Sequence, residues 1–291
     1  MLSKDVKFAF WGTDEFSVKF LETLKKKGVS PNLIITLPDK PKGRKLILTP
    51  PPAKIWSEEN EISFLQSEKL DDNLTSELKK QNFEIFVVAS YGKIIPKNIL
   101  DIPRFGSLNI HPSLLPKLRG PSPLQETILR EEEPGVTIIK MDEKMDHGPI
   151  IAQKKLQRKE SKDSSPEIYG FIELRDLLAK LGADILIEAL PRWIGKEIEE
   201  KPQDESLATY TKLIDKEDGL IDLEGDLWEN YKKIMAYEVW PQAYFFKEKN
   251  DKKTRVKITK AVFKENILKI EKVIPEGKNE MDYDSFIRSF S

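Results

Sequence analysis

Residues 6–26, VKFAFWGTDEFSVKFLETLKK, hold the pattern that decides the fold. The apolar run Val6–Trp11 predicts a buried strand that ends at Gly12. Asp14 is a suitable N-cap, and apolar residues at helical spacing after it predict a helix through Lys26. A strand that leads directly into a helix is the repeating unit of a sheet covered by helices on both faces.

The same alternation continues outward from this segment to about residue 190. Further strands are expected at 33–37, 63–65, 85–89, 107–110, 136–141 and 150–154, and helices at 53–60, 72–81, 123–130 and 166–190. Repeated strand–helix alternation favours an α/β fold with a doubly wound, mostly parallel sheet. We therefore expect one large α/β domain over residues 1–190.

The last third of the chain has a different texture. Residues 191–206 are polar and acidic and contain Pro202, which is typical of a linker. Short alternating apolar runs follow at 243–246, 256–262 and 267–273. Alternation of this kind predicts a small β-rich domain over residues 207–291, and a barrel is one form that it can take.

Composition excludes several classes of function. The 291 residues carry a net charge of −1, from 48 basic and 49 acidic side chains, so global charge does not indicate a nucleic-acid partner. The absence of cysteine excludes disulfides, thiolate catalysis and cysteine-bound zinc. No apolar stretch is long enough to span a bilayer. We expect a cytoplasmic protein without membrane or metal and, because no long apolar stripe is evident, a monomer.

The segment Ser107–Ile150 carries the residues suited to chemistry. Its strand SLNIH ends at Pro112, and because side chains alternate along a strand, Asn109 and His111 point to the same side. Open α/β sheets place their ligands at the carboxyl ends of strands. Further along, residues 141–149, MDEKMDHGP, supply two carboxylates and a glycine turn between two predicted strands.

These residue types suit acyl transfer to an amine. A histidine can move protons in both directions, and an asparagine amide can donate to the oxyanion of a tetrahedral intermediate. A carboxylate such as Asp146 can fix the imidazole tautomer and hold a water. Taken alone, the pattern has a simpler interpretation: Asn109 and His111 as a capping or packing pair, and Asp146 as a turn residue.

Four runs together resemble the signature of the folate-dependent formyltransferases. They are NIHPSLLP at 109–116, RGPSP at 119–123, GVTI at 135–138 and MDEKMDHGP at 141–149. The resemblance implies a Rossmann-like domain, 10-formyltetrahydrofolate as the formyl donor, tetrahydrofolate as product, and Asn109, His111 and Asp146 as catalytic residues. It also implies a set of folate-contacting residues: Tyr91, Gly92, Ile94, Ile95, Ser113, Leu114, Leu115 and Pro116.

Three other runs resemble the branch of this family that formylates the methionine carried on initiator tRNA for translation initiation. They are FWGTDEF at 10–16, LPDKPKGRK at 37–45 and VWPQAYF at 239–245. The resemblance implies an OB-like C-terminal barrel that binds tRNA. The implied tRNA contacts are Lys40, Lys42, Arg44 and Lys45 in the first basic loop and Lys252, Lys253 and Arg255 in the second, although a solvated hairpin tip is an equal interpretation of the second.

Some positions depart from that branch. Pro112 and the run His147–Pro149 are closer to the branch that formylates glycinamide ribonucleotide, while Lys45 and Gln242 each stand where a glycine is usual. The alternative is therefore a formyltransferase that acts on a small amine, either glycinamide ribonucleotide or an amino sugar nucleotide. The basic loop and the C-terminal domain argue against it, because small acceptors need neither.

Overall fold

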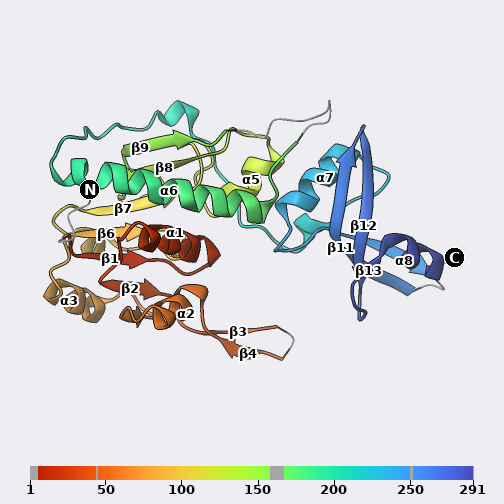
Figure 1. The fold of residues 1–291 in the computed structure, drawn as a ribbon, viewed down its shortest axis with the longest axis horizontal. Coiled ribbons are helices and arrows are strands. Elements are labelled where there is room, and N and C mark those ends of the chain that lie inside the picture. The colour runs from red at the N-terminus through yellow and green to blue at the C-terminus, as the bar shows by residue number, and fades with distance from the viewer. Residues whose placement is uncertain (1–5, 44, 158–166, 250–251, 291) are drawn as a thin grey trace. The chain divides into compact units, whose positions relative to one another are not determined.

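The computed structural model describes residues 6–43, 45–157, 167–249 and 252–290. The chain forms two compact units, each built from separate stretches of sequence (Figure 1). The first unit comprises the chain up to Pro121 together with Pro134–Leu156 and Arg175–Tyr210. The second comprises Ser122–Glu133, Gln157–Leu174 and the chain from Thr211 onward.

A seven-stranded sheet in the order β5-β2-β1-β6-β7-β8-β9 forms the centre of the first unit. Its strands are β1 (Phe8–Trp11), β2 (Leu33–Thr36), β5 (Phe64–Gln66), β6 (Ile85–Val88), β7 (Ser107–His111), β8 (Gly135–Lys140) and β9 (Ile150–Lys155). The five strands from β5 to β7 are parallel, whereas β8 and β9 pair antiparallel. The predicted α/β fold with a mostly parallel sheet is confirmed.

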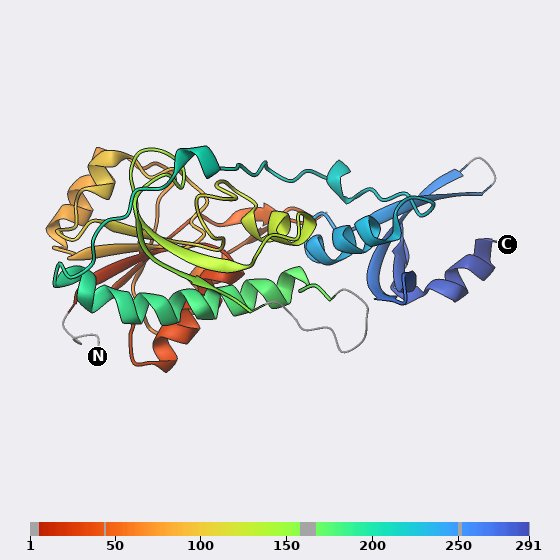
Figure 2. The same ribbon diagram turned by 90° about the horizontal axis from the view of Figure 1, so that it is seen from above.

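Helices cover both faces of this sheet (Figure 2). They are α1 (Glu15–Lys26), α2 (Pro52–Glu59), α3 (Asp72–Lys80), α4 (Lys97–Leu100) and α6 (Phe171–Ile194). On one face, Phe10 of β1 stacks on Phe20 of α1. On that face α6 also packs so closely on β7 that a Cβ added at Gly182 would lie 2.6 Å from Ile110. On the other face, Trp11 and Phe86 join one apolar cluster with residues of α3 and α4.

The Pro/Lys-rich loop after β2 folds as a hairpin of β3 (Lys40–Lys42) and β4 (Ile47–Thr49). At its base, both carboxylate oxygens of Asp39 accept hydrogen bonds from Lys54, and Gln66 donates to one of them. The hydrogen bonds from Gln66 and Lys54 hold the pKa of the Asp39 carboxyl below its ordinary value. The hairpin is thus attached to the body of the first unit by a charged side chain.

The second unit contains a four-stranded antiparallel sheet in the order β10-β11-β12-β13. Its elements are α5 (Pro123–Leu129), η2 (Glu217–Gly219), α7 (Leu227–Ala236), β10 (Tyr244–Lys249), β11 (Lys252–Lys264), β12 (Ile267–Pro275), β13 (Met281–Asp282) and α8 (Tyr283–Phe290). Phe245, Val256, Val273 and Phe286 lie in its apolar core. The predicted small β-rich domain is confirmed, while closure into an OB-like barrel stays a prediction.

Residues 191–206, expected as a linker, make specific contacts within the first unit. Helix α6 continues to Ile194, and the backbones of Ile150 and Lys201 exchange two hydrogen bonds of 2.8 and 3.1 Å. The short helix η1 (Glu205–Leu207) follows. In the described parts of the chain, no helix combines the length and apolar character needed to cross a membrane.

Candidate active site

Two candidate catalytic side chains come from β7, in the middle of the first unit's sheet. Asn109 lies opposite Val88 of β6 and Ile139 of β8, and His111 lies opposite Thr137 of β8. His111 is buried and Asn109 half-buried. Strand β7 is hydrogen-bonded to β6 on one side and to β8 on the other. The register of these strands therefore fixes the backbone positions from which the two side chains project.

Asp146 reaches these two residues from the connection between β8 and β9. Its Oδ1 accepts a hydrogen bond from Asn109 Nδ2 at 3.2 Å and lies 3.6 Å from His111 Nδ1. Its Oδ2 accepts from the backbone N–H of Gly120 at 2.8 Å. The structure thus brings together Asn109, His111 and Asp146, three residues that the sequence separates by up to 37 positions.

The second imidazole nitrogen of His111 determines which tautomer is present. Nε2 lies 3.0 Å from the carbonyl oxygen of Leu118. A carbonyl can only accept a hydrogen bond, so Nε2 carries the proton and donates it. In the neutral ring Nδ1 is then the basic nitrogen, and it faces Asp146. No side-chain pattern could have predicted this contact, because its acceptor belongs to the backbone.

The turn that carries Asp146 is packed tightly against the end of β8. A Cβ added at Gly148 would lie 1.8 Å from the carbonyl oxygen of Lys140, so only glycine fits there. Asp146 itself adopts a left-handed backbone conformation, with φ of 51°. Such a conformation is uncommon outside glycine and occurs where surrounding contacts impose it.

The predicted folate-contacting residues after β7 form a closed turn. The hydroxyl of Ser113 donates to the carbonyl of Lys117 at 2.8 Å. The backbone N–H of Leu115 donates to Thr137, and its carbonyl accepts from Gln153. A cis peptide bond joins Leu115 to Pro116, and the side chain of Leu114 lies where a Cβ on Gly135 would be. These bonds fix the shape of the turn beside His111.

The second group of predicted folate contacts follows β6, the neighbour of β7. Tyr91 is buried, its ring lies edge-on to Trp11 at 5.1 Å, and burial raises its pKa to about 12. Ile95 is also buried, but Ile94 is 80% exposed, and the backbone at Gly92 has φ of 85°. An exposed apolar side chain two residues from an exposed glycine suits a flat heteroaromatic ring that carries polar edges.

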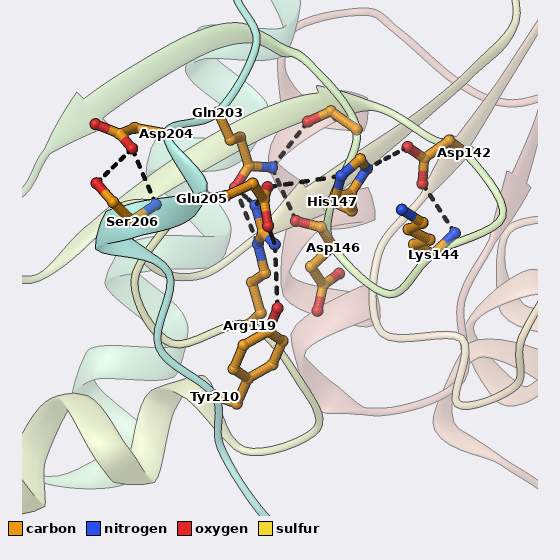
Figure 3. A network of polar contacts seen from close by, with 11 residues as sticks. Arg119, Asp142, Lys144, Asp146, His147, Gln203, Asp204, Glu205, Ser206 and Tyr210 are labelled. Atoms are coloured by element: carbon orange, nitrogen blue, oxygen red, sulfur yellow. Dashed lines mark hydrogen bonds and ion pairs between the residues drawn. The ribbon is translucent and has the colours of Figure 1, made fainter.

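A polar network that the sequence did not indicate surrounds Arg119 and reaches the turn that carries Asp146 (Figure 3). Arg119, only 1% exposed, makes hydrogen bonds to Gln203, Glu205 and Tyr210. The hydrogen bonds to Glu205 raise the pKa of the Arg119 guanidinium and lower that of the Glu205 carboxyl. Gln203 donates in turn to the carbonyl oxygens of Asp146 and Gly148, both at 2.8 Å.

Three of the four predicted tRNA-binding residues of the first loop lie on the β3–β4 hairpin. Lys40, Lys42 and Lys45 are exposed there, and Arg44 lies outside the described residues. The hairpin also exposes an apolar run that the sequence analysis did not single out: Leu46, Ile47 and Leu48 are 71%, 63% and 64% exposed. Cationic and apolar side chains therefore share this hairpin.

The predicted tRNA-binding residues of the second loop belong to the second unit. Lys252 begins β11, opposite Lys249 of β10. Lys253 lies over the ring of Phe246 at 4.4 Å, and the guanidinium of Arg255 lies over the ring of Tyr244 at 3.7 Å. Both cations are therefore held on aromatic faces of the neighbouring strand.

The sequence matches the model of one family, described as formyl transferase, over residues 6–189. This match covers the whole seven-stranded sheet and the three candidate catalytic residues Asn109, His111 and Asp146. The chain belongs to the formyl transferase family. The enzymatic character predicted from Asn109, His111 and Asp146 thus agrees with the family.

Curated relatives of this formyl transferase resemble it over most of their length. The methionyl-tRNA formyltransferase of Chloroflexus aurantiacus is 42% identical over 243 residues, which are 83% of this chain and 76% of that protein. The enzyme of that name from Thermotoga maritima is 40% identical over 83% of this chain and 75% of its own. The one from Bacillus subtilis is 38% identical over 82% and 74%.

Solved structures share the fold at lower sequence identity. A methionyl-tRNA formyltransferase from Clostridium thermocellum aligns with a TM-score of 0.60 at 20% identity, over 93% of this chain and 98% of that one. An N-formyltransferase from Helicobacter canadensis, in complex with folinic acid and dTDP-3-aminofucose, also gives 0.60 at 20% identity, over 89% and 88%. These likenesses show a fold common to family members with different names.

One departure of this formyl transferase from the usual motif lies in the Asp146 turn. His147 Nδ1 lies 2.6 Å from Asp142 Oδ2, and its Nε2 lies 3.5 Å from Glu205 Oε1. The histidine therefore adds a side-chain contact between the turn and the network around Arg119. Among the described residues, no three acidic, histidine or cysteine side chains are grouped as a metal site would require.

Proposed function

We propose that this formyl transferase moves the formyl group of 10-formyltetrahydrofolate onto the amino group of methionyl initiator tRNA, for translation initiation. The observation that carries the chemistry is the convergence of Asn109 and His111 on a single oxygen of Asp146. The acceptor is supported by the relatives named methionyl-tRNA formyltransferase, which are 38–42% identical and match over about three quarters of their length.

His111 moves the proton in this proposal. The amine nitrogen attacks the formyl carbon, and as the new C–N bond forms, the amine must lose a proton. Nδ1 is the nitrogen that can take it, directly or through a water held by Asp146, because Nε2 is already protonated against Leu118. The same proton then goes to the folate nitrogen when its bond to the formyl carbon breaks.

Asn109 stabilises the negative charge that develops on the formyl oxygen. Its Nδ2 carries two N–H bonds, and the bond to Asp146 uses one of them and fixes the orientation of the amide. The other can donate to the oxyanion, an interaction typically worth about 10²–10³ in rate. Asp146 orients the Asn109 amide, and the positive charge that His111 gains would lie beside the Asp146 carboxylate.

The folate is held by the two groups of residues that border β6 and β7. Ile94 offers an apolar surface for the pterin, and the backbone around Gly92 and Ile95 offers polar groups for its edge. The buried ring of Tyr91 anchors that loop through its contact with Trp11. The turn formed by Ser113, Leu114, Leu115 and Pro116 places the donor's reactive end next to His111.

The tRNA is held by cationic residues of both units. Lys40, Lys42, Arg44 and Lys45 of the hairpin would contact phosphates near the acceptor end, and Lys252, Lys253 and Arg255 would contact the backbone elsewhere. The division into residues 1–190, 191–206 and 207–291, a cytoplasmic location and a monomeric state belong to the same proposal.

The direct test is formyl transfer by the purified chain with 10-formyltetrahydrofolate and charged initiator tRNA. Elongator methionyl-tRNA, glycinamide ribonucleotide and an amino sugar nucleotide serve as competing acceptors. We expect N-formylmethionyl-tRNA from the initiator tRNA alone. Product on a small amine, with none on tRNA, would replace the acceptor and keep the chemistry. If no acceptor leads to the release of tetrahydrofolate, the proposal is refuted.

A further inference from the structure

Arg119, which follows Leu118 in the chain, is hydrogen-bonded to Gln203, and Gln203 is hydrogen-bonded to the turn that carries Asp146 (Figure 3). We propose that these two side chains are positioning residues, which set the geometry between His111 and Asp146 without contacting the substrate. The inference rests on the proposed function, because it assigns them a role in formyl transfer.

The amide of Gln203 is fully used by its neighbours. Its two N–H bonds go to the carbonyl oxygens of Asp146 and Gly148, and its oxygen accepts from Arg119 Nε at 3.1 Å and Nη2 at 2.8 Å. Exchanging the amide oxygen and nitrogen would set an N–H group against a guanidinium and an oxygen against two carbonyls. The orientation of the amide is therefore fixed, and no other side chain of this length supplies two donors and two acceptors.

The guanidinium of Arg119 is equally saturated. It makes five hydrogen bonds, two to Gln203, two to Glu205 and one to Tyr210, and a guanidinium has five N–H donors. Because the side chain is almost wholly buried, each of those donors would be costly to leave without a partner. Arg119 thus holds Gln203 in one place and is itself held there.

The backbone around this pair includes two residues in an unfavourable conformation. Leu118, which accepts the hydrogen bond of His111, has φ of 60°, and Asp146 has φ of 51°. Arg119 follows Leu118 directly and precedes Gly120, whose N–H binds the Asp146 carboxylate. Gln203 donates a hydrogen bond to the backbone carbonyl of Asp146. The pair therefore stabilises both left-handed residues at once, and with them the distance between His111 and Asp146.

The hydrogen bonds of the pair distinguish it from residues that only stabilise the fold. Apart from those with Arg119, the side-chain hydrogen bonds of Gln203 with the described residues go to the turn that carries Asp146. The strand on which Asn109 and His111 lie is held by its own hydrogen bonds to β6 and β8. Loss of Gln203 should therefore displace the turn and leave the sheet intact.

The test compares two variants. Gln203→Glu keeps the hydrogen-bond acceptor and loses both donors, and Arg119→Lys keeps the positive charge and loses the planar guanidinium with its five donors. Asp204→Asn is the matched control, because this exposed neighbour bonds only within its own turn. Full-length proteins are assayed for kcat and KM with formyl donor and methionyl-tRNA. Hydrogen exchange of residues 142–149 and of the strands is followed by mass spectrometry, with the melting temperature.

We expect Gln203→Glu to lower kcat by about 10- to 100-fold with little change in KM, since small displacements of catalytic groups cost rates of that order. Exchange should rise in residues 142–149 and stay unchanged in β1, β6 and β7. Arg119→Lys should behave similarly, and the double variant should be no worse than the poorer single variant. Asp204→Asn should match the wild type throughout.

Wild-type kcat in Gln203→Glu would overturn the inference. A loss of kcat accompanied by faster hydrogen exchange throughout the sheet would also overturn it, because that pattern is expected of a residue that stabilises the whole fold. If the wild type formylates no acceptor, the proposed function fails by itself. The exchange data then still decide whether Gln203 holds the Asp146 turn, and unchanged exchange would refute that part.

Discussion

The Nε2 atom of His111 lies 3.0 Å from the carbonyl oxygen of Leu118, and this contact fixes the proton on that nitrogen. The ring therefore presents its basic Nδ1 to Asp146, 3.6 Å away, which is too long for a direct hydrogen bond. A carboxylate at that distance stabilises a charged imidazole by its field and leaves the lone pair of Nδ1 accessible.

Asp146→Asn tests that field. The amide is nearly isosteric, and its oxygen can still accept from Gly120 while the hydrogen bond from Asn109 is lost, so the fold should survive. The charge beside His111 disappears, and kcat should fall by about 100-fold or more. Steady-state kinetics with circular dichroism measure both effects. Asp142→Asn, in the same connection, is the control and should retain most activity; equal losses in the two variants would assign the effect to the turn as a whole.

Gly148→Ala should destabilise the protein through a steric clash. The new methyl would lie 1.8 Å from the carbonyl oxygen of Lys140, so backbone must move, and forced packing typically costs about 1–3 kcal/mol. Gly28→Ala provides the contrast, because Gly28 has open space and only a left-handed φ of 77°, for which the strain is about 1 kcal/mol. Urea unfolding measures the free energy of unfolding of both variants. A smaller loss of that free energy in Gly148→Ala than in Gly28→Ala would contradict the tight packing of the turn.

Glu205 should give the stability of the protein an acid-sensitive component. Hydrogen bonds from Arg119 lower the pKa of the Glu205 carboxyl below its ordinary value of 4.5. A carboxyl with a depressed folded pKa stabilises the fold above its unfolded pKa, and this contribution disappears as the pH falls through the folded pKa. Wild type should therefore exceed Glu205→Gln in unfolding free energy at pH 7, and the difference should vanish at the acid end of a urea series. A gap independent of pH would refute the ion pair.

Tyr91→Phe should not weaken the protein and should stabilise it by about 1 kcal/mol. The hydroxyl of Tyr91 is buried without a hydrogen-bond partner among the described residues, and desolvation raises its pKa to about 12. Removing the hydroxyl leaves the ring packed against Trp11. Thermal unfolding measures the change, and folate affinity should stay the same. Weaker folate binding would instead assign the hydroxyl to the ligand.

Lys42→Ala should weaken tRNA binding without changing the chemistry. If Lys42 contacts one phosphate, its loss should reduce the slope of log affinity against log salt by about 1. Filter binding over a salt series measures the slope, with Lys79→Ala of helix α3 as an exposed control. An unchanged slope would remove Lys42 from the tRNA surface, and a fall in kcat at saturating tRNA would point to a different role.

The sequence predicted the elements with strong local periodicity. Strand β1 and helix α1 were found within two residues of their bounds, because one is a continuous apolar run and the other has a cap at Asp14 that accepts from Phe16 and Ser17. The helix expected at 166–190 begins at Phe171 and extends to Ile194, with Pro191 inside it. The β3–β4 hairpin, α4, α7 and α8 were not predicted, because their periodic stretches are short or rich in charged residues.

The candidate site was predictable only where side chains supply it. Asn109, His111 and Asp146 stand out by type and order, whereas the Leu118 carbonyl and the Gly120 N–H are backbone groups that any residue would provide. Arg119 and Gln203 are 84 residues apart, and no local pattern links them. The partners of a buried cation depend on how distant segments meet, which single-sequence periodicity does not encode.

The ribosome adds Gln203 84 residues after Arg119. All strands of the seven-stranded sheet are therefore synthesised before Gln203 is added. The nascent protein would therefore pass through a stage in which the Asp146 turn lacks Gln203 and the proposed formyl transfer is slow. It would reach its full rate only when the stretch through Tyr210 has left the exit tunnel. A fragment cut at the end of the family match, residue 189, should remain in that early stage.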